Sequence, residues 1–85
     1  MKYKIEYDSK ILKELKKLDK FVAIEILKDI ESFFLNPVST SIKKLKTPFD
    51  GAYRLRLGQY RVIFYEENEL ILISKIAHRK KVYDN

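Results

Sequence analysis

The fold is decided by residues 52–65, whose sequence is AYRLRLGQYRVIFY. Apolar residues alternate with arginines next to Gly58-Gln59, and a glycine supplies the positive φ angle that a tight hairpin turn requires. Because successive side chains of a strand point to opposite faces, the alternation predicts a β-hairpin with one packed face and one charged face.

In the predicted register Arg56 lies opposite Arg61, and Arg54 shares their face. The other face would carry Tyr53, Leu55, Leu57, Tyr60, Val62 and Phe64. Like charges that face each other across a sheet are unfavourable by roughly a few tenths of a kcal/mol, and a bound anion would account for them. In the alternative, the aliphatic stems of the arginines simply cover Ile63 and Tyr65. We favour the binding face, because only a bound anion explains why two arginines are opposed.

The first half of the chain predicts a strand followed by two helices. Residues 2–7 alternate like a short strand, and their charges favour a place at the edge of a sheet. Asp8 or Ser9 would cap an amphipathic helix. A second cap at Asp19 would begin a longer helix that ends before Asn36-Pro37. The two helices would form an αα-hairpin.

The second half predicts a loop and then three strands. Residues 36–51 contain both prolines and one of the two glycines, so we expect a loop, anchored by Ile42 and Leu45. The strands are predicted at about 52–57, 60–66 and 69–76, with Glu67-Asn68 as the second turn. An apolar run at 70–73 is typical of a central strand.

Together these elements predict an α+β fold of the order β-α-α-β-β-β. An antiparallel sheet would carry the two-helix hairpin on one of its faces. With 85 residues, the chain is expected to form one domain over residues 1–85.

Charge is concentrated in the second half of the chain. The net charge is +6, and residues 42–85 contain ten Lys plus Arg against five acids. All four arginines lie there: Arg54, Arg56, Arg61 and Arg79. Because the guanidinium group binds phosphate through two parallel hydrogen bonds, this half of the chain predicts a phosphate-binding surface.

Several classes of site are excluded by composition. One His, no Cys and two Gly rule out zinc clusters, phosphate-binding glycine loops and dinucleotide fingerprints. We therefore expect no metal and no cofactor. The apolar runs are too short to span a bilayer, and no signal peptide is evident. The absence of cysteine fits a reducing compartment, so we expect a cytoplasmic protein without contact to membranes.

Three residues after the last predicted strand complete the candidate site. His78, Arg79 and Tyr83 are expected to gather beside the arginines. Adjacent cations favour the phenolate form of Tyr83, which could accept a proton from a ribose 2′-OH or stack on a base. Equally, Tyr83 could pin the tail to the core. His78 has the pKa range of a general acid, although a single loop histidine is more often only exposed.

Three lysines in the predicted loop are candidate contacts for a nucleic-acid backbone, namely Lys43, Lys44 and Lys46. An ordinary solvated loop would explain them equally well.

On these residues, the chain resembles the RelE/ParE toxin superfamily of bacterial and archaeal toxin–antitoxin pairs, on its RelE side. Three segments carry the resemblance: Lys44-Leu45-Lys46, residues 53–65 and residues 78–83. It extends over nearly the whole chain and implies the RelE-like fold. The hairpin and tail motifs are specific only when taken together.

The resemblance implies a ribosome-dependent mRNA endonuclease that cuts A-site codons without metal. A ribose 2′-OH would attack the adjacent phosphate, leaving a 2′,3′-cyclic phosphate and a 5′-OH. By position, Arg54 and Arg56 match basic residues near the scissile bond, and Arg61 and Arg79 match phosphate-stabilising arginines. Tyr83 matches the tyrosine near the 2′-OH.

The chain departs from the best-known pattern at Arg54 and Arg56, which replace lysines. Because arginine does not readily lose its proton, a base role cannot transfer to these positions. Tyr83 or His78 is left as the base.

Two other functions fit the same sequence. One is a ParE-like inhibitor of DNA gyrase that does not catalyse a reaction. The other is an inactive relative that only binds RNA. A toxin of this kind also implies a cognate antitoxin protein, besides the ribosome and mRNA, as a partner.

Overall fold

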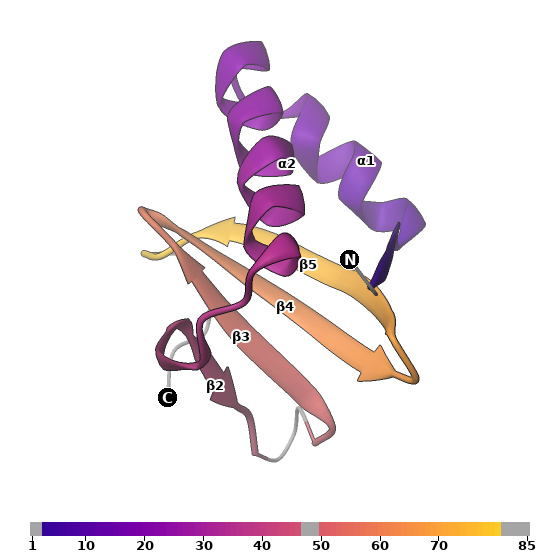
Figure 1. Ribbon diagram of the computed structural model, residues 1–85. Coiled ribbons are helices and arrows are strands. Elements are labelled where there is room, and N and C mark those ends of the chain that lie inside the picture. The colour runs from indigo at the N-terminus through magenta and orange to yellow at the C-terminus, as the bar shows by residue number, and fades with distance from the viewer. Residues whose placement is uncertain (1–2, 47–49, 81–85) are drawn as a thin grey trace.

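A computed structural model describes residues 3–46 and 50–80 of the chain. The first half forms β1 (Lys4–Tyr7), α1 (Ser9–Lys16), α2 (Lys20–Leu35) and the short 3-10 helix η1 (Ser39–Ser41). The second half forms β2 (Ile42–Lys44), β3 (Ala52–Leu57), β4 (Tyr60–Glu67) and β5 (Leu70–His78). The strands make one sheet in the order β1-β5-β4-β3-β2, and both helices lie on one of its faces (Figure 1). The predicted α+β class is confirmed.

Aspartate caps begin both helices where the sequence predicts them. The Oδ1 atom of Asp8 accepts a hydrogen bond from the Lys10 N–H at 2.9 Å. Asp19 does the same for the Phe21 N–H at 2.8 Å. Each carboxylate thus satisfies a backbone donor that lacks a partner within its helix. The second cap separates α1 from α2, and α2 ends at Leu35 as predicted.

The core lies between the helices and the sheet. The helices contribute the buried side chains of Ile11, Ile26, Ile30 and Phe34, and the sheet contributes Leu55, Val62, Phe64, Ile71, Ile73 and Ile76. Phe34 makes edge-on ring contacts with Tyr3, Phe33 and Phe64, at centroid distances of 5.8, 5.1 and 5.2 Å. The contact with Phe64 of β4 holds the end of α2 on the middle of the sheet. We call this covered side of the sheet the helix face.

The prediction of a wholly antiparallel sheet is wrong at one strand. β1 runs parallel to β5, with Lys4 beside Leu70 and Tyr7 beside Ile73. β1 does lie at an edge, as its charges suggest, and β5 is an internal strand. Strand direction in this pair depends on how the intervening helices and hairpins return the chain, which local alternation does not encode.

Residues 36–51 are not only a loop, as predicted, because they contain η1 and β2. Ile42 pairs with Leu55, and the Leu45 N–H donates to the Ala52 carbonyl oxygen at 3.0 Å. The predicted anchors Ile42 and Leu45 are both half-buried. Burial of these two side chains against the sheet brings the chain close enough to add an edge strand.

The second hairpin turns one residue later than predicted. Asn68 and Glu69 adopt positive φ angles of 52° and 66°, so they are the central residues of the turn. Asparagine tolerates this region, which glutamate disfavours. In the first hairpin the Gly58 φ is 56°, as the predicted turn at Gly58-Gln59 requires.

A β-bulge changes the side-chain alternation of β5. The register shifts between Ile63 and Phe64, which pair with Lys75 and Ile73, so Ser74 has no partner residue on β4. Ile71 and Ile73 are buried on the helix face before the bulge, and Ile76 is buried there after it. The bulge therefore moves the residues that follow it to the opposite faces from those that simple alternation predicts.

α1 stabilises the edge of β5 beyond the end of β1. The Ile76 N–H donates to the Glu14 Oε1 atom at 3.3 Å. An unpaired strand edge exposes backbone donors to foreign strands, and Glu14 satisfies one of them. Among the described residues, no helix is long and apolar enough to cross a membrane.

The side chain of Tyr7 on β1 forms a hydrogen bond with α2. The Tyr7 hydroxyl donates to the Glu31 Oε2 atom at 3.2 Å. Burial, with the charge of Glu31 and this hydrogen bond, raises the pKa of Tyr7 to about 12.

Tyr7 should make stability depend on alkaline pH. Its pKa is higher in the folded chain than in the unfolded one, so its stabilisation is complete below about pH 10 and is lost as the pH rises towards 12. Because solvent screens this partly exposed pair, we expect a loss of about 1 kcal/mol. Urea unfolding of wild type and Tyr7→Phe between these pH values checks this. The Tyr7→Phe profile should be flatter, and parallel profiles would contradict the assignment.

Candidate nucleic-acid interface

Arg56 and Arg61 face each other across the first hairpin, as the predicted register requires. Leu57 and Tyr60 flank the two-residue turn, so they form the hydrogen-bonded pair and the two arginines form the next, non-hydrogen-bonded pair. Cβ atoms in such a pair are typically about 4.5–5.5 Å apart. Arg54 lies on the same face, opposite Ile63. We call this side of the sheet, which carries no helix, the arginine face.

The Arg61 side chain is held against the hairpin turn. Its Nη1 atom donates to the carbonyl oxygens of Gly58 at 3.0 Å and Tyr60 at 3.1 Å. Two carbonyl acceptors on one nitrogen fix the orientation of the planar guanidinium group and limit its rotamers. Arg61 is thus positioned by the turn that the glycine makes possible.

The arginine face also contains a small apolar cluster. Ile63 is 4 % exposed and Ala52 is fully buried, with Leu45 and Ala77 packed against them. Among the described residues, Leu45 and Ala77 pack against this cluster, and neither helix lies on this face. Arg54 lies opposite Ile63, so the aliphatic stem of Arg54 can cover Ile63, and this accounts for an arginine at position 54. It does not explain why Arg56 is opposed to Arg61.

His78 is predicted to lie beside the arginines, but the structure places its side chain on the helix face. It pairs with Tyr60, and the two rings meet edge-on at a centroid distance of 5.5 Å. Its Nδ1 atom accepts a hydrogen bond from the Lys80 N–H at 3.2 Å. The β5 bulge is the cause, because it shifts the alternation by one residue before His78 is reached.

Arg79 lies beside the turn of the first hairpin. Its backbone N–H donates to the Gln59 carbonyl oxygen at 2.7 Å. The end of β5 therefore lies next to the turn that holds Arg61. Tyr83 lies outside the described residues.

The three predicted lysines do not form one group. Lys43 pairs with Arg54 and shares the arginine face, whereas Lys44 pairs with Tyr53 on the helix face. Lys46 follows β2 and is exposed. Sequence reasoning missed Lys75, which pairs with Ile63 on the arginine face. Alternation through the run of isoleucines on β5 would place Lys75 on the helix face, so only the bulge identifies it.

Arg56→Thr should stabilise the chain. The substitution removes the repulsion with Arg61, and threonine suits a strand, so we expect a gain of a few tenths of a kcal/mol. Salt screens exposed charges, so the gain should shrink at high ionic strength. Urea unfolding at low and high salt measures it. A loss of stability at low salt would show that the opposed arginines carry no electrostatic penalty.

No group of three or more His, Asp or Glu side chains that could hold a metal ion occurs within residues 3–46 and 50–80. The described cations of the arginine face are the guanidinium groups of its arginines and the ammonium groups of Lys43 and Lys75. They can neutralise a phosphodiester and stabilise the additional charge of its pentacoordinate transition state.

Comparison with known proteins gives the same family from sequence and from structure. A family model described as the ParE toxin of the type II toxin–antitoxin system parDE matches residues 5–83. The toxin-like protein RelE1 of Methanocaldococcus jannaschii is 33% identical over 90 aligned residues, which cover 100% of this chain and 99% of that protein.

Two solved structures share the fold. One is a RelE–RelB complex from Pyrococcus horikoshii, with a TM-score of 0.70 and 28% identity over 96% of this chain and 100% of that chain. The other is a RelBE2 toxin–antitoxin complex from Mycobacterium tuberculosis, with a TM-score of 0.79 and 18% identity over 93% and 100% of the two chains. At 18% identity the second likeness concerns the fold alone.

The fold and the family match define a toxin of a type II toxin–antitoxin system. This chain belongs to the RelE/ParE toxin superfamily, and its sequence relatives and structural neighbours make it a RelE-like toxin.

Proposed function

We propose that this toxin is a ribosome-dependent endonuclease that cuts mRNA in the ribosomal A site. The observation that carries the proposal is the pair of opposed arginines, Arg56 and Arg61, on a sheet face without a helix. Like charges that face each other across a pair of strands repel. A phosphodiester between the two guanidinium groups would turn the repulsion into attraction. Resemblance to RelE toxins supports the same function.

In the proposed reaction, the ribose 2′-OH attacks the adjacent phosphorus and the bond to the leaving 5′-oxygen breaks. The 2′-OH proton passes to a base, and the leaving oxygen gains a proton, giving a 2′,3′-cyclic phosphate and a 5′-OH. Arg61 and Arg79 are proposed to stabilise the charge that develops on the phosphate oxygens. Arg54 and Arg56 are proposed to bind the strand near the scissile bond, and Lys43 to contact its backbone.

Tyr83 is the preferred base, and His78 is the less favoured choice. The ring of His78 packs against Tyr60 on the helix face, and its Nδ1 accepts a hydrogen bond from the backbone. A general base must come within hydrogen-bond reach of the proton that it removes. Since the sheet separates the His78 ring from the arginine face, the tail that carries Tyr83 is the better source of the base. Lys44 and Lys46 would contribute at most peripheral backbone contacts.

Primer extension on an mRNA translated in a purified system tests the proposal. With the toxin present, we expect new ends within A-site codons, and 5′-OH groups on the downstream fragments. Naked mRNA should be cut little or not at all. Intact mRNA together with normal translation would contradict the proposal.

Gyrase inhibition is the second candidate, favoured by the match to a family model named for ParE toxins. It would use the same fold as a binding surface without catalysis. A DNA supercoiling assay decides between the two functions. Inhibition at a low toxin concentration, with no cut in translated mRNA, would establish the ParE-like function. Salt-sensitive RNA binding without either effect would indicate an inactive relative.

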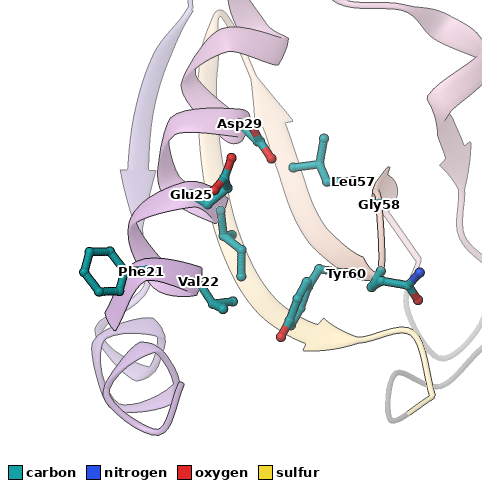
Figure 2. A pocket seen from close by; sticks show the side chains of 9 residues that line it. Phe21, Val22, Glu25, Asp29, Leu57, Gly58 and Tyr60 are labelled. Carbon is teal, nitrogen blue, oxygen red and sulfur yellow. The ribbon is translucent and has the colours of Figure 1, made fainter. Parts of the chain in front are cut away.

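A cognate antitoxin is the proposed partner, since similar toxins are found in complexes with RelB. A cavity of about 270 Å³ lies between α2 and the first hairpin. Figure 2 shows Val22 of α2 and Tyr60 of β4 on its two sides, with Glu25 and Asp29 above them. Apolar walls with a carboxylate rim suit an amphipathic antitoxin segment that carries Lys or Arg beside its apolar side chains. Toxin and antitoxin would both act in the cytoplasm.

Phe21→Asp should weaken that complex without affecting the fold. Phe21 lines the cavity and is 79% exposed, so its replacement removes little core packing but adds a charge to the apolar surface. We expect at least a tenfold loss of affinity for the antitoxin, with cleavage unchanged. Co-purification and titration of the two proteins measure this. Unchanged affinity would place the antitoxin elsewhere, for example across the arginine face.

A further inference from the structure

A second cavity lies beside the bulge of β5, where α1 meets the edge of the sheet. Its volume is about 270 Å³. It is lined by Lys10, Glu14, Ile63, Tyr65, Ser74 and Lys75. None of these residues is needed for the proposed cleavage reaction.

Tyr65 is the distinctive member of this lining. It lies on the arginine face and is 38% exposed, whereas Ile63, two residues earlier on the same face, is 4% exposed. The neighbouring side chains that cover Ile63 therefore leave the Tyr65 ring accessible. An exposed aromatic ring on a basic sheet face is the feature with which many proteins stack the bases of single-stranded RNA.

The charges around the cavity suit a phosphate. Lys75 lies across from Ile63 on β5, and Lys10 lies in the first turn of α1. The carboxylate in the lining, Glu14, accepts a hydrogen bond from the Ile76 N–H. Two ammonium groups thus stand against one carboxylate that is already engaged by the backbone, so an anion is favoured here.

The cavity continues the arginine face. Tyr65 follows Arg61 by four residues on β4, which at the rise of a strand is about 13 Å. A few nucleotides of an extended single strand can span this length. An RNA held by Arg56 and Arg61 would therefore bring a flanking nucleotide to Tyr65.

We propose that Tyr65, Lys75 and Lys10 form a second contact site for single-stranded RNA. The base of a nucleotide that flanks the scissile bond stacks on the Tyr65 ring, and the two lysines hold its phosphate. The inference rests on the proposed ribonuclease function for the direction of the strand. Because every base can stack, this site adds affinity with little preference for sequence.

Tryptophan fluorescence tests the site directly, because the chain contains no Trp. A Tyr65→Trp protein carries a single indole that a stacked base quenches. The probe is single-stranded oligoadenylate at low ionic strength. Leu35→Trp, at a position of α2 that is 64% exposed, is the matched control. We expect saturable quenching in the Tyr65→Trp protein, none in the control, and much less with duplex RNA, whose bases are already stacked.

Substitutions separate stacking from charge. Tyr65→Ala should weaken oligoadenylate binding roughly fivefold to tenfold, and Tyr65→Phe should leave it unchanged, because the ring rather than the hydroxyl stacks. Lys75→Gln should lower the slope of log affinity against log salt by about 0.7, as for one lost phosphate contact to a single strand.

The outcome is separable from that of the cleavage experiment. In a translating system, Tyr65→Ala should raise the toxin concentration needed for half-maximal cleavage and leave the cleavage step itself nearly unchanged. Absence of quenching, or equal quenching in the Leu35→Trp control, overturns the second site whether or not the wild type cuts mRNA. Quenching without any cleavage would retain the site and reject the ribonuclease.

Discussion

Arg61→Ala is expected to reduce mRNA cleavage by about 10²–10³-fold, which is the usual loss when one preorganised donor to a developing oxyanion is removed. Arg61 lies opposite Arg56, and its guanidinium is oriented by the carbonyl oxygens of Gly58 and Tyr60. The group is therefore set in place before substrate binds, so little reorganisation accompanies the reaction. The rate at saturating toxin, followed by primer extension on translated mRNA, measures the effect.

Two variants show whether the effect is specific. Lys28→Ala removes the same charge from an exposed position of α2 and should cut mRNA like the wild type. Arg61→Lys keeps the charge but lacks the planar fork, so its activity should fall between those of wild type and Arg61→Ala. Thermal unfolding of each variant shows whether a loss of activity comes from a loss of folding. Wild-type cleavage by a folded Arg61→Ala protein would remove the arginine face from the mechanism.

Phe34→Ala should destabilise the chain by about 3–5 kcal/mol, because it leaves a cavity at the centre of the core. Phe34 is 2% exposed and contacts three other aromatic rings, those of Tyr3 just before β1, Phe33 on α2 and Phe64 on β4. A domain of this size has a stability of the same order. We expect a large fall in the melting temperature and in the urea midpoint, as circular dichroism and urea titration would show.

The neighbouring residue is the matched control. Leu35 is 64% exposed, so Leu35→Ala removes apolar atoms from the same end of α2 without opening a cavity. Its stability should change by less than about 0.5 kcal/mol. Similar losses in both variants would mean that the end of α2 contributes through helix propensity rather than through core packing.

The parts of the fold that were predictable from sequence are those that local interactions determine. Asp8 and Asp19 cap the helices through hydrogen bonds to nearby backbone groups, and Gly58 closes the first hairpin. Alternation on β3 and β4 places Arg54, Arg56 and Arg61 on one face because the paired strands have no bulge between them there. Half of the candidate interface therefore follows from the hairpin sequence.

The parts that were not predictable depend on contacts between distant segments. β2 forms because Ile42 and Leu45 pack on a sheet that the rest of the chain builds. The direction of β1 depends on its pairing with β5, which is more than sixty residues away in the chain. Neither contact leaves a local pattern, since both segments would be equally amphipathic with another partner.

The hairpin, its opposed arginines and the two capped helices follow from local sequence, because each arises from residues a few positions apart. Which face of the sheet each side chain of β5 occupies depends on tertiary contacts. The bulge at Ser74 adds one residue to that strand, so Lys75 joins the arginine face while His78 packs against Tyr60 on the helix face. A single unpaired residue inverts every side chain after it. Whether a strand takes one up depends on the packing of Ile73 and Ile76 under the helices and on the hydrogen bond from Ile76 to Glu14, which the alternation of β5 does not encode.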